Sequence, residues 1–192
     1  KKGMLLFSTL RMKRFFSFGS IILLGPAISA DPPEVPQGLV SEVWMEFRMF
    51  NAKVGYSHTT IHRDGDVVQV RTETTMKINR AGANVETISI ESSRETIDGK
   101  PLSFFASSGE GGTPVRKKGV FVDGKIRVTA KQFGREKTNQ YDFDRRGIMS
   151  WGLELLSRKH GTAKGTAYEA WLYSPEFGMD APTKVTVASG GM

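Results

Sequence analysis

Residues 54–95 contain three β-type segments joined by two turn signals, and this stretch constrains the fold more than any other part of the chain. In its middle segment, apolar or small side chains alternate with charged and polar ones, and this period of two residues is typical of a strand with one buried face. The side chains expected on the buried face are Val68, Val70, Thr72, Thr74, Met76 and Ile78. Gly65 and Gly82 in the turn signals tolerate the positive φ of a tight reversal. The stretch therefore predicts an antiparallel meander.

Segments of the same type extend the meander on both sides. The segment before it should bury Val43, Met45, Phe47 and Met49. Further strands are predicted over residues 102–107, 115–122, 125–133, 135–143, 167–173 and 184–188. We expect one sheet of about nine to eleven strands, which curls because strand twist accumulates across a sheet of that size.

The only convincing helix covers residues 151–160, with Ser150 placed to cap its start and Gly161 placed to end it. Its apolar side chains share one face, which a single helix can bury only against the sheet. The sequence thus predicts a mainly β fold, a single curved antiparallel sheet resembling a half-barrel, with one helix packed on the concave face.

The N-terminal part of the chain has the features of a secretory signal. Basic residues precede a short apolar run that ends in small residues near Ala30. The alternative is an uncleaved membrane anchor, but the apolar run is shorter than the ~20 residues that span a bilayer. We predict a signal peptide over residues 1–30, a proline-rich linker over residues 31–40 and an antiparallel β domain over residues 41–192. The expected location is periplasmic or secreted, with no stable membrane span after leader removal.

Charge and cysteine content exclude several classes of function. The formal net charge is +7, but residues 1–30 hold five of the 27 basic residues and no acidic one, which leaves 22 basic against 20 acidic residues. Nucleic-acid binding therefore loses its electrostatic support. The chain has no cysteine, so it has no disulfide, no thiolate metal site and no cysteine nucleophile.

The remaining polar patterns are better explained by structure than by chemistry. His58 and His62 have metal-ligand spacing for a helix, but in a strand they lie roughly 13 Å apart. The serines Ser57, Ser103 and Ser107 belong to no nucleophile pattern. Alternating basic residues at Lys125, Arg127, Lys131, Arg135 and Lys137 are typical of a solvated strand face. We expect no catalytic residue, no metal and no cofactor in this chain.

Four short words carry a family resemblance: Val54-Gly55-Tyr56, Asp98-Gly99-Lys100-Pro101-Leu102, Gly152-Leu153-Glu154-Leu155-Leu156 and Lys164-Gly165-Thr166. Over residues 40–188 the chain resembles the exported N-terminal β domain of bacterial transglutaminase-like proteins. In that family the β domain precedes a papain-like module with a cysteine, histidine and aspartate triad, and this chain has neither the cysteine nor a second module. More distantly, the domain resembles the half-barrels of periplasmic lipoprotein carriers, which hold acyl chains.

Two functions follow as hypotheses. The first is a non-catalytic accessory or interaction domain of an exported transglutaminase-like protein, with a downstream catalytic module or an envelope protein as partner. Whether the intact protein is an enzyme stays open at this point. The alternative is a periplasmic carrier of a lipid or another apolar ligand, with a hollow lined by Trp44, Phe47, Met49, Phe104, Phe105, Trp171 and Tyr173.

Overall fold

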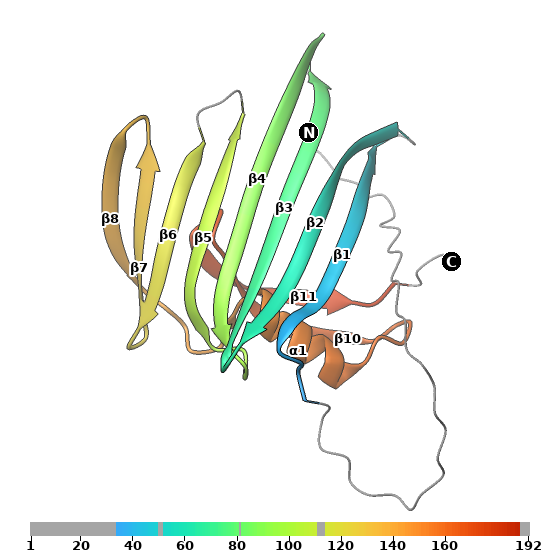
Figure 1. The fold of residues 1–192 in the computed structure, drawn as a ribbon, viewed down its shortest axis with the longest axis vertical. Coiled ribbons are helices and arrows are strands. Elements are labelled where there is room, and N and C mark those ends of the chain that lie inside the picture. Colours follow the sequence, from blue (N-terminus) through green and yellow to red (C-terminus); the bar gives the residue numbers. More distant parts are fainter. Residues whose placement is uncertain (1–33, 50–51, 81, 111–113, 189–192) are drawn as a thin grey trace, which may run out of the picture.

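A computed structural model describes residues 34–49, 52–80, 82–110 and 114–188 of the chain (Figure 1). The leader expected over residues 1–30 lies outside the described residues. The first strand begins at Gly38, inside the segment that we predicted as a linker.

Eight antiparallel strands form one curved, open sheet, in which each strand pairs with its neighbours in sequence. They are β1 (Gly38–Met49), β2 (Ala52–Asp64), β3 (Val67–Arg80), β4 (Ala83–Thr96), β5 (Pro101–Glu110), β6 (Val115–Val122), β7 (Lys125–Gln132) and β8 (Arg135–Asp142). The prediction of a mainly β fold built on a curved antiparallel sheet with one helix is confirmed. Gly65 and Gly82 adopt φ values of 58° and 85°, as the turn signals require.

The remaining strands form a separate three-stranded sheet, which the sequence reading had assigned to the main sheet. It contains β9 (Gly147–Ile148), β10 (Ala167–Ser174) and β11 (Met179–Thr186), in the order β11-β10-β9. The helix α1 (Ser150–His160) lies between β9 and β10 in sequence, so these two strands run parallel, as a crossover connection allows. The two-residue β9 is too short to show a period in the sequence.

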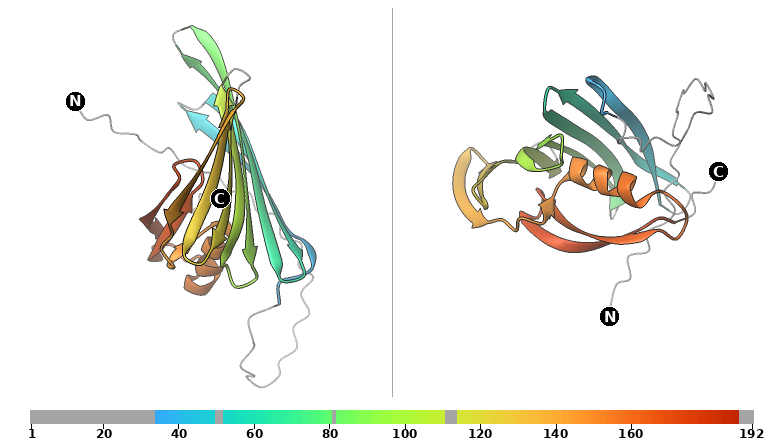
Figure 2. Two further views of the ribbon diagram at one scale, coloured as in Figure 1. Left: turned by 90° about the vertical axis from the view of Figure 1, so that its left-hand side faces the viewer. Right: turned by 90° about the horizontal axis from the view of Figure 1, so that it is seen from below.

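Helix α1 lies between the two sheets at one end of the molecule (Figure 2). The predicted helix is confirmed, and its start differs by one residue, but the predicted N-terminal cap is wrong. Met149 is the N-cap residue, Ser150 is already helical, and no side chain of the cap position bonds the helix. Gly161 ends the helix at φ 82°. Among the described residues, no helix has the length and apolar character needed to cross a membrane.

A buried carboxylate from the sheet supplies the cap instead. Glu95 on β4 is 0% exposed, and it accepts hydrogen bonds from the Trp151 N–H through Oε1 and from the Gly152 N–H through Oε2, both at 2.8 Å. The Ser93 hydroxyl donates a third bond to Oε1 at 2.7 Å. Burial raises the pKa of Glu95, and these three donors act in the opposite direction because they stabilise the carboxylate.

Two glycines let the chain approach closely enough for this cap. Gly99, at φ 83°, lies against Gly152, and a Cβ on Gly99 would come within 2.9 Å of the Gly152 Cα. A Cβ on Gly152 would come within 2.8 Å of the Ile148 Cβ. The turn between β4 and β5 therefore packs directly on the first turn of α1.

The core consists of two clusters on the concave face of the sheet, both near α1. One contains Val35, Ile61, Val68, Val70 and Trp151, and the other contains Phe104, Ala106, Ile126, Val128, Met149 and Tyr173. Trp151 is fully buried, and its indole N–H donates to the Ile97 carbonyl oxygen at 2.9 Å.

The predicted buried faces are buried only where α1 and the small sheet cover them. Val68 and Val70 are buried, whereas Met76 and Ile78 farther along β3 are half-buried. On β1, Val43, Met45 and Phe47 are half-buried and Met49 is 41% exposed. The cause is length, because β2, β3 and β4 extend far beyond the helix (Figure 1).

Replacing Glu95 should test the cap. In Glu95→Gln one side-chain acceptor becomes a donor, which leaves a buried helix N–H unsatisfied and should lower the free energy of unfolding by roughly 1–3 kcal/mol. Urea denaturation followed by far-UV circular dichroism measures it. The control Glu86→Gln, on the exposed part of β4, should change stability by less than ~0.5 kcal/mol. Equal losses in both variants would contradict the cap's importance.

Candidate binding surfaces

Two of the three histidines stack on aromatic rings. His58 Nε2 lies 2.7 Å from Glu42 Oε1, and its ring stacks on Trp44 with centroids 4.0 Å apart. His160 stacks on Tyr168 at 4.6 Å. Ser57 follows the other face of β2 and is buried. Within the part of the chain that the structure describes, no group of three histidine, aspartate or glutamate side chains could hold a metal ion.

A groove of about 530 Å³ lies between α1 and the small sheet. Gly152, Leu155, Leu156 and Lys159 form its helical wall at spacings of three and four residues, so they share one helix face. The other lining residues are Asp98, Gly99, Arg146, Ile148, Glu169, Ala170, Trp171 and Pro182. The groove is therefore lined by apolar side chains together with four charged ones, Asp98, Arg146, Lys159 and Glu169.

A fixed cation–aromatic pair, Arg146 and Trp171, lines the groove. The Arg146 guanidinium lies 4.2 Å from the Trp171 ring centroid and bonds to Asp144 Oδ2 at 2.7 Å. The hydrogen bonds from Arg146 lower the pKa of Asp144 to about 2. The Trp171 indole N–H donates to Asp180 Oδ2 at 2.7 Å, which fixes the other edge of the ring.

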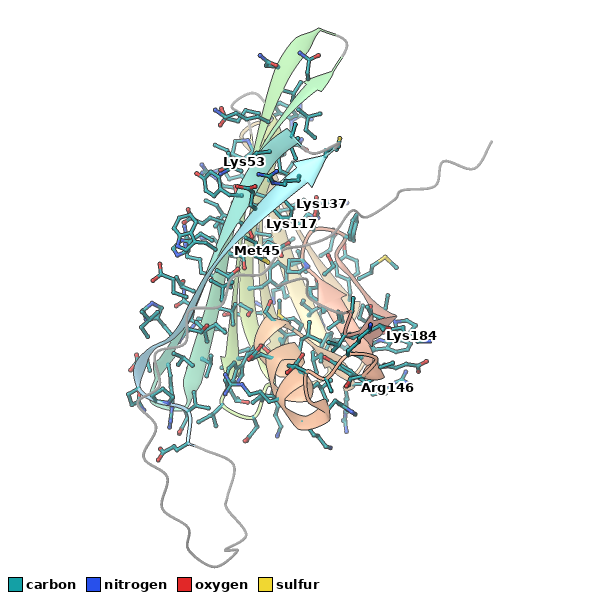
Figure 3. The ribbon with its side chains drawn as sticks, turned by 90° about the vertical axis from the view of Figure 1, so that its right-hand side faces the viewer. Met45, Lys53, Lys117, Lys137, Arg146 and Lys184 are labelled. Atoms are coloured by element: carbon teal, nitrogen blue, oxygen red, sulfur yellow. The ribbon has the colours of Figure 1, made fainter. Side chains whose placement is uncertain are left out.

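The second surface is the uncovered part of the concave face, which we call the open core face. Its side chains are half-buried and uncharged, and the strand register places them on the same side as Val68 and Val70. They are Val43, Met45 and Phe47 of β1, Thr59 of β2, Thr72, Thr74, Met76 and Ile78 of β3, and Val85, Thr87 and Ser89 of β4. Met45 lies at the β1 edge, and Lys117 and Lys137 mark the far strands of the same sheet (Figure 3).

Glu91 lies where this face meets the core, between cavities of about 290 Å³ and 230 Å³. Burial raises its pKa, and the nearby Glu176 charge raises it further. The Lys117 ammonium donates to the backbone carbonyl oxygens of Pro175 and Glu176, which holds the turn between β10 and β11 beside Glu91. Tyr173 lines the smaller cavity, and burial raises its pKa to about 12.

The seven residues predicted to line one hollow lie in four places. Phe104 and Tyr173 pack together in the core with ring centroids 5.5 Å apart. Trp171 lines the groove, and Phe47 and Met49 belong to the concave side of β1. Trp44 and Phe105 follow the opposite, convex side of the sheet. The structure therefore brings only two of the seven into contact.

The sequence did not predict most of the groove residues. It also predicted that the alternating basic residues of residues 125–137 share one strand face. Arg146 and Pro182 carried no periodic signal, and the groove joins segments that are distant in sequence. The alternating basic residues divide between two faces, because Lys131 pairs with Glu136 whereas Ala130 pairs with Lys137. Lys125, Arg127 and Lys131 lie on the convex side, and Arg135 and Lys137 lie on the concave side.

No protein-family model, no curated protein and no solved structure matches this chain.

The raised pKa of Glu91 predicts that ionisation of this carboxyl group lowers the stability of the folded protein. The folded protein holds the Glu91 proton more tightly than the unfolded chain does, so stability falls as pH rises from about 4.5 through the folded pKa. Glu91→Gln should therefore be more stable than the wild type at pH 7 and equal to it below pH ~4, by about 1.4 kcal/mol for each unit of pKa shift.

Urea denaturation at the two pH values measures this difference. Glu176→Gln removes the like charge near Glu91, so the stability of this variant should depend less on pH than that of the wild type. A stability gain in Glu91→Gln that is the same at both pH values would show that Glu91 packing, and not its charge, is responsible.

Proposed function

We propose that this chain is a non-catalytic interaction domain of an exported transglutaminase-like protein, and that its open core face receives the partner. The observation that carries the proposal is the composition of that face. Along β1 to β4 it presents methionine, phenylalanine, isoleucine, valine, serine and threonine, and a charged side chain, Glu91, lies at its border with the core, opposite Thr72. Interface centres are depleted of charge and enriched in methionine and aromatic residues.

The opposite side of the same strands combines charged side chains with exposed apolar ones, which are Trp44, Tyr56 and Ile88. It carries Glu42, Glu46 and Arg48 on β1, Arg71, Glu73 and Lys77 on β3, and Glu86 on β4. This part of the sheet is remote from α1. The core of this domain therefore does not explain why the concave face is apolar there. A partner surface that covers Met76 and Ile78 supplies one.

The partner that we favour is the catalytic module expected downstream in such proteins. Sequencing the gene beyond Met192 gives the reading frame of that module, which can be expressed as a separate polypeptide. Isothermal titration calorimetry with the two purified parts then measures their affinity. A cysteine, histidine and aspartate module that shows no binding to this chain would contradict the proposal.

One substitution pair locates the binding surface. Met76→Asp puts a charge on the open core face and should weaken binding at least tenfold, because an unpaired carboxylate would have to be desolvated. Thr75→Asp, the adjacent residue on the convex side, should leave the affinity within about twofold of wild type. Circular dichroism and thermal unfolding confirm that both variants are folded. Equal loss in both variants would move the partner off this face.

A second candidate, a carrier of an apolar ligand, is favoured by the groove beside α1. Its volume of about 530 Å³ lies within the range of ligand sites, and its lining combines apolar side chains with a few charged ones. In this form of the carrier hypothesis, the ligand binds the groove residues and not the seven residues predicted from the sequence. Trp171 belongs to both sets.

The carrier can be tested on the purified full chain. Solvent extraction with mass spectrometry should find a stoichiometric acyl ligand, and a fluorescent fatty acid should bind saturably. Leu156→Gln should weaken that binding about tenfold, whereas Leu153→Gln, outside the groove lining on the same helix, should not. No extracted ligand together with no saturable binding would exclude the carrier.

A further inference from the structure

The two edges of the large sheet differ in their protection. An edge strand exposes unpaired backbone groups, and proteins protect such edges with charged side chains. At one edge, β8 has the sequence Arg-Glu-Lys-Thr-Asn-Gln-Tyr-Asp, which is polar or charged on both sides. At the other edge, β1 pairs with β2 alone among the described strands. Its charged side chains, Glu42, Glu46 and Arg48, lie on the convex side only, and its concave side presents Val43, Met45 and Phe47.

The packing of Trp44 also differs between its two ring faces, one toward β2 and one toward the free edge. Its ring stacks on His58 of the neighbouring strand at 10° between planes, so the second face of the indole is directed away from β2, toward the side with no described strand. Trp44 is 56% exposed there. A strand added beside β1 would continue the row of cross-strand neighbours and cover this ring.

We propose that the strand added at this edge is β1 of a second copy, paired antiparallel about a two-fold axis at Met45. The pairing of identical edges by a two-fold axis perpendicular to the sheet is antiparallel and keeps both concave faces on one side. The register shift near the end of β1 inserts the extra residue, Val54, into β2. Alternation along β1 is therefore regular over residues 41–49, and Met45 is the centre of that segment.

Charge and the length of the paired segment together select this register. With the axis at Met45, Glu42 lies opposite Arg48 of the other copy, and Val43 lies opposite Phe47. An axis at Trp44 would put Glu42 opposite Glu46, and an axis at Glu46 would put two copies of Glu46 together, and like charges directly opposite are destabilising. An axis at Val43 or at Phe47 brings no like charges together, but it would pair only residues 41–45 or 45–49 of the regular segment. Arg48 also bonds Glu46 of its own strand at 2.6 Å, so it is held on the convex side where Glu42 lies.

The position of the axis is compatible with the rest of the fold. Val40, near the start of β1, packs on the core cluster around Trp151, whereas Met45 lies farther along β1, in the part of the strand remote from α1 (Figure 3). The open core faces of both copies would then form one continuous surface. Because a single strand pair buries little area, we expect a weak dimer that dissociates on dilution.

The absence of cysteine makes a clean cross-linking test possible. Directly opposite residues of an antiparallel pair have Cα atoms about 4.5–5.5 Å apart, which suits a disulfide. Met45→Cys should therefore give a covalent dimer on mild oxidation. Val43→Cys is the matched control, since the two copies of residue 43 would lie ~13 Å apart along the strands. Non-reducing gel electrophoresis measures the yield.

Sedimentation velocity over a concentration series tests the same interface without a cross-link. Glu42→Arg should weaken the dimer at least tenfold, and adding Arg48→Glu in the same chain should restore it, because the pair opposite each other is then reversed. Circular dichroism verifies folding of each variant. A wild-type chain that stays monomeric up to about millimolar concentration, equal cross-linking of Met45→Cys and Val43→Cys, or no rescue by the double variant would overturn the proposal.

Discussion

The hydrogen bonds from the N-terminus of α1 to Glu95 tie together the parts of this structure. An eleven-residue helix is marginally stable by itself, and its first N–H groups need acceptors. Glu95 supplies both acceptors from the central strand β4, and its burial is tolerated because three donors surround the carboxylate. The same contact fixes Trp151 of α1 in the core, where it packs with Val68 and Val70 of β3. The small sheet then follows, because α1 is the crossover that joins β9 to β10.

A short helix anchored at one end of long strands leaves the other end uncovered. The sequence of β3 changes accordingly along its concave side, from Val68 and Val70 under the helix to Thr72 and Thr74 beyond it. Methionine and isoleucine then return at the far end, where no described element of this chain covers them. Because α1 covers only part of β3, the change to Thr72 and Thr74 is expected, but the apolar Met76 and Ile78 are not. Their apolar character is what makes a partner surface the better account of this end.

Local patterns predicted the parts of the fold that depend on local physics. Period-two alternation and glycine turns located all eight strands of the main sheet, with ends that differ by a few residues. Ser150 was predicted as the cap because a cap is normally supplied from the adjacent chain, whereas Glu95 lies 56 residues away in sequence from Trp151. Alternation also shows which side of a strand faces inward without showing how far along the strand the cover extends. The burial of Met49 was therefore overestimated.

The binding surfaces depend on contacts between distant segments, so the sequence indicated them only in fragments. Trp171 attracted attention as an aromatic residue, but the groove exists because Gly99 and Gly152 let the β4–β5 turn approach α1. Trp44 was grouped with the interior residues because aromatic side chains usually fill a core, yet its register with His58 places it on the convex side at the edge. That placement, together with the charged β8 at the opposite edge, indicates that the two edges of the sheet are under different constraints. Strand β8 carries charge on both of its sides, which is typical of an edge that stays free. Strand β1 carries charge on the convex side only, beside an exposed indole, and its concave side is apolar, so its composition protects the edge less.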